Sequence, residues 1–206
     1  MPGIAEPVLV TAPEAAGRLG PGPHPALFLD RDGVINVDHG YVHSAEGTDW
    51  VPGIFDLARA ARAAGYVLVV ATNQAGIARG YYDEERFRDY TRWVHQRFEA
   101  EGAPLLATYY CPHHPEAGQG GYRTACMCRK PAPGMLLRAI GDHGLDPVRS
   151  VMVGDTPKDM EAAPAARVGG RFLLEGDGGR ARCAVQCRSV SSLAEVAGML
   201  PRYAGG

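Results

Sequence analysis

The sequence predicts an α/β protein with a doubly wound, mainly parallel, Rossmann-like sheet. Three nearly unbroken apolar runs, at residues 26–29, 66–71 and 150–153, have the composition of strands buried on both faces. Patterns with helical spacing lie between these runs. Alternation of strand and helix is typical of a parallel sheet covered by helices. Weaker strand candidates of the same kind occur at residues 105–110 and 171–174.

The expected helices are recognised by apolar residues at steps of three and four. Residues 53–64 have this spacing, and Gly65 follows as a stop signal. Residues 83–101 begin with Asp83 and two glutamates, which suits a helix start. Pro164 limits or kinks the fourth helix of the set. The remaining helices are expected at residues 135–140, 159–166 and 192–200.

Length and composition indicate one domain, residues 1–206, with residues 1–25 as an N-terminal extension. A chain of 206 residues with 46% hydrophobic and 21% charged residues is an ordinary globular protein. The formal net charge of −2 excludes a general attraction to nucleic acid or anionic membranes. No apolar run is long enough to span a membrane, and the first residues do not resemble a signal peptide. We expect a cytoplasmic monomer that binds neither nucleic acid nor membrane.

Polar side chains follow each of the three strongest strand candidates. Asp30 and Asp32 follow the first, residues 72–74 follow the second, and Asp155 follows the third. In open parallel sheets, ligands bind beyond the carboxyl ends of the strands. Two carboxylates so close together repel each other unless a cation neutralises them, and Mg²⁺ prefers such oxygen ligands. The alternative is that Asp30 and Asp32 are solvated turn residues.

Four segments resemble, in order, the motifs of haloacid dehalogenase (HAD) superfamily phosphatases. They are residues 28–36 (FLDRDGVIN), 71–73 (ATN), 129–131 (RKP) and 154–159 (GDTPKD). The resemblance covers about residues 26–174 and implies a HAD fold with a phosphoaspartyl mechanism. No insertion large enough for a cap domain separates the motifs, so we expect a capless enzyme with a fairly open site.

The resemblance assigns the reacting groups to the strand ends. Asp30 is expected to attack phosphorus as the nucleophile, and Asp32 to act as general acid and then general base. Mg²⁺ is expected to be held by Asp30, Asp155 and the backbone carbonyl of Asp32. Thr72 and Lys130 are expected to contact the phosphoryl group, with Asp159 orienting Lys130 or a water molecule.

A second group of residues has the composition of a zinc site. Three thiols and an imidazole flank a loop that is rich in glycine and has few large apolar residues. We expect a structural Zn²⁺ that stabilises the loop at residues 111–128, although His114 could replace His113 and the thiols could be free. Cys183 and Cys187 receive no role. The expected ligands are Cys111, His113, Cys126 and Cys128.

The zinc loop is similar to that of two capless groups, the heptose 1,7-bisphosphate phosphatases and the histidinol-phosphate phosphatases. Residues 35–43 and 72–80 resemble the heptose group. That resemblance implies that Arg129 recognises a second phosphate and that two short segments contact the substrate. One departure is Thr156, where heptose members often carry lysine; Lys158 follows two residues later. The substrate contacts implied are Asp38, His39, Gly40 and Tyr41 around the sugar, and Thr72, Asn73, Gln74 and Ala75 near the phosphate.

The resemblance therefore implies a Mg²⁺-dependent phosphatase that removes the 7-phosphate of a heptose 1,7-bisphosphate. Such an activity supplies activated heptose for lipopolysaccharide or other surface glycans. One alternative is a histidinol-phosphate phosphatase, which a comparison of kcat/KM on the two substrates distinguishes. A second is a catalytically silent sugar-phosphate sensor, although Asp30 and Asp32 are both present. A nucleic-acid 3′-phosphatase is disfavoured by the net charge of −2.

Overall fold

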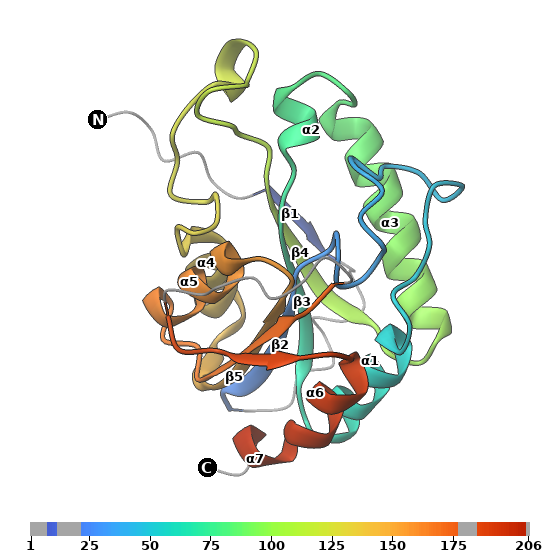
Figure 1. Cartoon of the computed structure of the whole chain (residues 1–206), viewed down its shortest axis with the longest axis vertical. Coiled ribbons are helices and arrows are strands. Elements are labelled where there is room, and N and C mark those ends of the chain that lie inside the picture. Colours follow the sequence, from blue (N-terminus) through green and yellow to red (C-terminus); the bar gives the residue numbers. More distant parts are fainter. Residues whose placement is uncertain (1–7, 12–21, 177–184, 205–206) are drawn as a thin grey trace.

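A computed structural model describes residues 8–11, 22–176 and 185–204, and its described part is built around one seven-stranded sheet (Figure 1). The strand order is β1-β4-β3-β2-β5-β6-β7, in which β2 to β7 are parallel and β1 runs antiparallel to β4. The predicted doubly wound, mainly parallel architecture is confirmed. The strands are β1 (Val8–Thr11), β2 (His24–Leu29), β3 (Val67–Asn73), β4 (Leu105–Cys111), β5 (Leu145–Gly154), β6 (Gly170–Leu174) and β7 (Arg188–Val190).

Helices cover both faces of the sheet, as the sequence predicted. One face packs against α1, α3 and α6, and the other packs against α4 and α5 (Figure 1). Alternate residues of β2 serve the two cores: Leu27 and Leu29 face the first, and Phe28 faces the second. The helices are α1 (Ile54–Ala63), α2 (Ala75–Ala78), α3 (Glu84–Ala100), α4 (Gly134–His143), α5 (Pro157–Ala165), α6 (Leu193–Met199) and α7 (Pro201–Ala204).

Local sequence signals explain where the longest helix begins and ends. The carboxylate of Asp83 accepts a hydrogen bond from the backbone N–H of Arg86 and so caps α3, as predicted. The buried side chains of α3 recur along one face, including Phe87, Tyr90, Val94 and Phe98. This regular apolar face fixes α3 against the sheet beside the loop that follows β2.

The order of the strands places a topological switch point between β2 and β5. After β2 the chain builds β3 and β4 on one side of it, and then crosses to β5 on the other side. The connections through α1 and α3 lie on one face of the sheet, whereas α4 and α5 lie on the other. A crevice forms where neighbouring strands send their chains to opposite faces, so Asp30 and Asp155 follow β2 and β5 at the usual ligand-binding position.

Two short strands were not predicted. Residues 8–11 were expected in an extension, but Val8 to Thr11 form β1, whose backbone pairs with Tyr110 to Ala107 of β4. The other new strand, β7, has three residues and pairs with β6. Runs this short contain too little periodicity to predict a strand. Among the residues that the structure describes, no helix has both the length and the apolar character needed to cross a membrane.

Candidate active site

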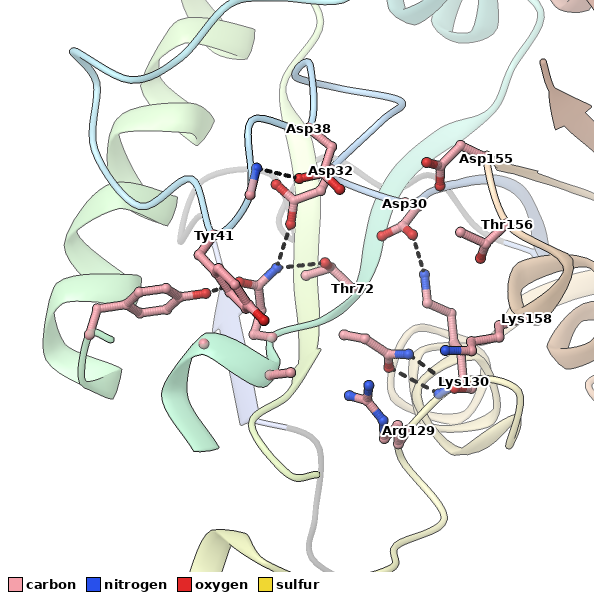
Figure 2. Close-up of a pocket in the computed structure, with 16 residues that line it drawn as sticks. Asp30, Asp32, Asp38, Tyr41, Thr72, Arg129, Lys130, Asp155, Thr156 and Lys158 are labelled. Atoms are coloured by element: carbon pink, nitrogen blue, oxygen red, sulfur yellow. Dashed lines mark hydrogen bonds and ion pairs between the residues drawn. The ribbon is translucent and has the colours of Figure 1, made fainter. Parts of the chain in front are cut away.

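A pocket of about 370 Å³ lies at the carboxyl ends of β2, β3 and β5 (Figure 2). Four segments that are distant in the sequence line it: residues 30–41, 72–82, 129–130 and 155–158. Its volume is within the range of small-molecule sites. All of the residues predicted to act in catalysis and all but one of those predicted to contact substrate lie in its wall. The lining also includes Gly76, Tyr82, Thr156 and Lys158.

The floor of the pocket is a buried ion-pair cluster. The Nζ atom of Lys130 lies 2.9 Å from Oδ2 of Asp30 and 2.5 Å from Oδ1 of Asp159, and it donates to the carbonyl of Ala71 at 2.7 Å. The Lys130 side chain is 2% exposed and that of Asp159 is fully buried. The cost of removing the Lys130 ammonium from water is therefore offset by its direct pairing with two carboxylates. Asp159 contacts Lys130, one of the two partners that the sequence suggested for it.

Asp30 and Asp155 have the arrangement expected of a site for a divalent cation. Ligand oxygens of Asp30, Asp155 and Asp159 lie within 4.8 Å of one another. Asp159 already pairs with Lys130 and accepts a hydrogen bond from Thr156, whereas Oδ1 of Asp155 is buried without a hydrogen-bond partner. A hard cation such as Mg²⁺ would satisfy that oxygen. Asp30 and Asp155 are therefore suitably placed for their predicted role as magnesium ligands.

The charges at this point also favour a cation. Burial raises the pKa of Asp30 to about 8. Lys130 opposes this shift, whereas the negative charges of Asp159 and Asp155 add to it. Burial and the Asp159 charge raise the pKa of Asp155 to about 6. The backbone also approaches Asp155 closely: Gly33 has a φ of +83°, and a Cβ atom there would overlap Oδ2 of Asp155.

Asp32 points away from this cluster and is held by several donors. Arg31 donates to both carboxylate oxygens of Asp32 at 2.8–3.2 Å, and Asn36 donates to Oδ1 at 3.0 Å. The guanidinium of Arg31 is itself buried, lies over the ring of Tyr90 at 5.1 Å, and donates to the carbonyl of Val42. The role of Arg31 could not be predicted from the sequence, because a basic residue between two aspartates gives no sign that it will be buried.

The residues after β3 join the second and third predicted motifs. The side chain of Asn73 accepts a hydrogen bond from the backbone N–H of Lys130 and donates to its carbonyl, both at 3.0 Å. Thr72 is buried at the pocket wall, and its Oγ1 accepts a hydrogen bond from Gln74 at 2.8 Å. Gln74 also donates to Oδ2 of Asp32 at 3.1 Å. The predicted phosphate-binding residues are therefore linked to Asp32.

The predicted sugar-binding segment lies at the pocket rim, with one exception. Asp38, Gly40 and Tyr41 line the pocket, and the Asp38 carboxylate accepts a hydrogen bond from the backbone of Gly40 at 2.9 Å. His39 does not line it. Its Nε2 atom lies 2.8 Å from Oδ2 of Asp49, so the ring is held outside the pocket by an exposed partner.

Basic groups gather on one side of the pocket. Figure 2 shows Arg129 and Lys158 on the same side as Lys130. The Nη1 atom of Arg129 donates to the backbone carbonyl of His113 at 3.1 Å, which ties Arg129 to the cysteine-containing loop. Thr156 caps α5 together with Asp159. Lys158 lines the pocket from the first turn of α5.

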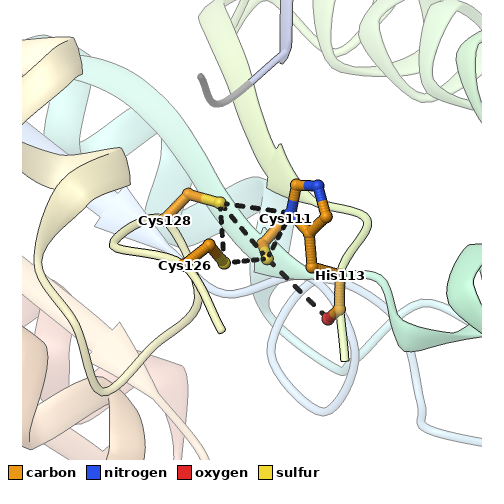
Figure 3. A group of neighbouring side chains, drawn as sticks. All are labelled: Cys111, His113, Cys126 and Cys128. Carbon is orange, nitrogen blue, oxygen red and sulfur yellow. Dashed lines mark hydrogen bonds between the residues drawn. The ribbon is translucent and has the colours of Figure 1, made fainter. Parts of the chain in front are cut away.

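The four predicted zinc ligands form one cluster beside β4 (Figure 3). The three sulfur–sulfur distances are 3.2, 3.4 and 3.5 Å, and Nδ1 of His113 lies 3.6 Å from Sγ of Cys128. Around a tetrahedral Zn²⁺ with bonds of about 2.3 Å, sulfur ligands lie about 3.8 Å apart. The donor set and its spacing therefore fit a closed structural site. The members of the cluster are Cys111, His113, Cys126 and Cys128.

The structure distinguishes between the two histidines that were considered for this cluster. His113 directs Nδ1 at the thiols, whereas Nδ1 of His114 accepts hydrogen bonds from the backbone of Glu116 and Ala117. Cys187 is a free thiol outside the cluster, and Cys183 lies outside the described residues.

Fold and site together define a HAD-like phosphatase, in which a buried aspartate and lysine meet at the switch point of a parallel sheet. The HAD-hydrolase-like family model matches residues 127–191. The chain is 51% identical over 150 residues to the D-glycero-beta-D-manno-heptose-1,7-bisphosphate 7-phosphatase of Vibrio cholerae. This match covers 73% of this chain and 81% of that protein. Identity to the enzyme of the same name from Escherichia coli K12 is 47%, over 73% of this chain and 78% of that protein. The chain belongs to the D-glycero-β-D-manno-heptose-1,7-bisphosphate 7-phosphatase family.

Solved structures agree with this assignment. A HAD-like phosphatase from Mesorhizobium loti has a TM-score of 0.84 at 33% identity, covering 97% of this chain and 96% of that one. The D,D-heptose 1,7-bisphosphate phosphatase of B. bronchiseptica, complexed with magnesium and phosphate, has a TM-score of 0.73 at 31% identity. That match covers 86% of this chain and 98% of the other.

Proposed function

We propose that this protein removes the 7-phosphate of D-glycero-β-D-manno-heptose 1,7-bisphosphate through a phosphorylated Asp30. The observation that carries the proposal is the geometry at the switch point, where Asp30 contacts Lys130 and lies beside Asp155. The family supports the substrate, because relatives with 45–51% identity carry this name, including the β configuration.

In the first half of the reaction, a carboxylate oxygen of Asp30 attacks phosphorus and the bond to the sugar oxygen breaks. Asp32 gives its proton to that departing oxygen, which becomes the sugar hydroxyl. Lys130 lies 2.9 Å from Asp30, so its charge can stabilise the phosphoryl oxygens, together with a hydrogen bond from Thr72.

In the second half, Asp32 takes a proton from a water molecule whose oxygen attacks the phosphorus of the phosphorylated Asp30. The bond between phosphorus and Asp30 breaks and phosphate leaves, while Asp32 is again ready to protonate a leaving group. Magnesium, held by Asp30, Asp155 and the carbonyl of Asp32, would neutralise the charges that carboxylate and phosphate bring together.

The remaining pocket residues would orient the bisphosphate. Arg129 offers a planar set of donors to the 1-phosphate, which does not react. The sugar would lie between Asp38, Gly40 and Tyr41 on one side and the segment Asn73–Ala75 on the other, since both segments line the pocket. His39 is not included, because it lies outside the lining and contacts Asp49.

The test is a comparison of kcat/KM for both anomers of the heptose bisphosphate and for histidinol phosphate, with ³¹P NMR of the product. We expect the highest value for the β anomer and a product that keeps only the 1-phosphate. A higher value for histidinol phosphate, or a product that keeps only the 7-phosphate, would overturn the proposal.

The proposal includes a structural Zn²⁺ at the four-residue cluster and a cytoplasmic, monomeric enzyme with one domain. A reducing compartment suits three neighbouring cysteines that form no disulfide. A single domain is supported by the one sheet that all described strands share. Light scattering after gel filtration tests the monomer.

A further inference from the structure

Tyr82 lies in the pocket wall but has no part in the chemistry described above. Its side chain is buried, at 7% exposed, and its hydroxyl donates a hydrogen bond to Oε1 of Gln74 at 2.6 Å. Neighbouring groups hold the ring in place. It stacks on His43 with 4.7 Å between ring centroids, and a Cβ atom at Gly76 would overlap it. The phenol is therefore fixed where it can hydrogen-bond to Gln74.

The Tyr82 hydroxyl and the Asp32 carboxylate together hold the Gln74 amide in one orientation. Gln74 is 1% exposed, and both polar atoms of its amide have partners within the protein. With Tyr82 donating to Oε1, the amide nitrogen faces Oδ2 of Asp32 at 3.1 Å and Oγ1 of Thr72 at 2.8 Å. The reversed amide would place one oxygen against the Asp32 carboxylate, which can only accept when ionised.

Asp32 and Thr72 differ in how they depend on this orientation. The Thr72 hydroxyl both donates and accepts, so it can pair with either end of the amide. The ionised Asp32 carboxylate can pair only with the nitrogen. Its other donors, Arg31 and Asn36, come from its own segment of the chain, so Gln74 is its one described hydrogen-bond donor from β3 and the turn that follows it.

We propose that Tyr82 is a positioning residue for the acid–base aspartate: its hydrogen bond holds the Gln74 amide in place, and Gln74 in turn fixes Asp32. This inference rests on the proposed function of Asp32. It predicts that loss of the Tyr82 hydroxyl impairs proton transfer to the departing sugar oxygen and spares attack by Asp30.

A comparison of leaving groups tests this prediction. The sugar oxygen needs a proton in order to leave, whereas the nitrophenolate of p-nitrophenyl phosphate leaves without one. The parameter kcat/KM covers the steps up to the phosphorylation of Asp30. For Tyr82→Phe we expect a loss of about three- to tenfold on the heptose bisphosphate, as for one buried hydrogen bond, and almost no change on p-nitrophenyl phosphate.

The route through Gln74 is tested by a double-mutant cycle. In Gln74→Leu, adding Tyr82→Phe should cause no further loss, because the link to Asp32 is already broken. Gln74→Glu keeps an acceptor for Tyr82 but removes the donor to Asp32, so on phosphate esters that carry no sugar its loss in kcat/KM should grow with the pKa of the leaving alcohol. This variant leaves Tyr82 intact and tests the inference even if Tyr82→Phe folds poorly.

Tyr66→Phe is the matched control. It removes a buried phenol whose hydroxyl donates to the carbonyl of Leu200 at 2.9 Å, far from the pocket, and both substrates should be turned over normally. Equal losses of Tyr82→Phe on both substrates, or an undiminished loss in the Gln74→Leu background, would overturn the inference. If the wild type hydrolyses another alkyl phosphate but not the heptose bisphosphate, the proposed substrate is wrong, and the same variants on that phosphate still test Tyr82.

Discussion

The ammonium nitrogen of Lys130 lies 2.9 Å from Oδ2 of Asp30 at the floor of the pocket. A lysine that is 2% exposed is stable there because the carboxylates of Asp30 and Asp159 face it. The pair joins the first predicted motif to the third. It places a positive charge where a phosphoryl group transferred to Asp30 would carry negative charge.

Lys130→Met should lower kcat by at least about a hundredfold. It should also lower the free energy of unfolding by about 3 kcal/mol, because Asp159 is left buried without its partner. Adding Asp159→Asn removes that unpaired charge, so the double variant should regain stability but not activity. Thermal unfolding and phosphate release measure the two effects. Activity that returns together with stability would show that Lys130 has only a structural role.

Cys126→Ser should lower both the zinc content and the stability of the loop at residues 111–128, because one of four ligands is lost. Elemental analysis should give about one zinc per chain in the wild type. Arg129 donates a hydrogen bond to the carbonyl of His113 in this loop. A loosened loop should therefore also displace Arg129 and raise the KM for the bisphosphate.

Cys187→Ser is the matched control for the zinc prediction, since Cys187 is a free thiol outside the cluster. It should leave zinc content, melting temperature and KM unchanged. Undiminished thermal stability of a metal-free wild-type preparation would contradict a structural role for zinc.

His95 should make the protein less stable in mild acid. Burial lowers the pKa of His95 to about 4 from 6.5, and its Nε2 lies 2.8 Å from Oγ1 of Thr108. Between pH 6.5 and 4 the unfolded chain binds a proton at this residue and the folded chain does not, so stability falls as the pH falls. Each pH unit costs about 1.4 kcal/mol, or about 3 kcal/mol across the window.

The measurement is chemical unfolding of the wild type and His95→Gln in the same buffers between pH 4 and 7. The variant should lose less stability on acidification than the wild type does. Equal losses in the two proteins would mean that His95 is protonated in the folded state as readily as in the unfolded chain.

The sequence was sufficient to predict the sheet, because continuous apolar runs such as residues 26–29 and 66–71 are too short for typical buried helices and suit strands that are buried on both faces. The positions of Asp30, Thr72 and Asp155 followed from the rule that parallel strands end at the same edge. The cluster of three cysteines and His113 was predicted because thiols and an imidazole close together in the sequence are typical of a metal site.

Contacts made across the fold could not be predicted in this way. The burial of Arg31 depends on the ring of Tyr90, which α3 supplies from about sixty positions along the chain. The role of Tyr82 depends on one hydrogen bond between its hydroxyl and Gln74. His39 was expected at the sugar, but Asp49 holds it outside the pocket. Each of these results comes from side-chain geometry, which periodicity and motif order do not specify.

The most direct test is to isolate the phosphorylated enzyme. Asp32→Asn, mixed with magnesium and p-nitrophenyl phosphate, can be phosphorylated without an acid but lacks the base that speeds attack by water. Acid quenching and mass spectrometry of the peptides should then find one phosphoryl group, carried by Asp30, and Asp30→Asn should give neither label nor turnover. A phosphoryl group on another residue, or full turnover by Asp30→Asn, would contradict the mechanism.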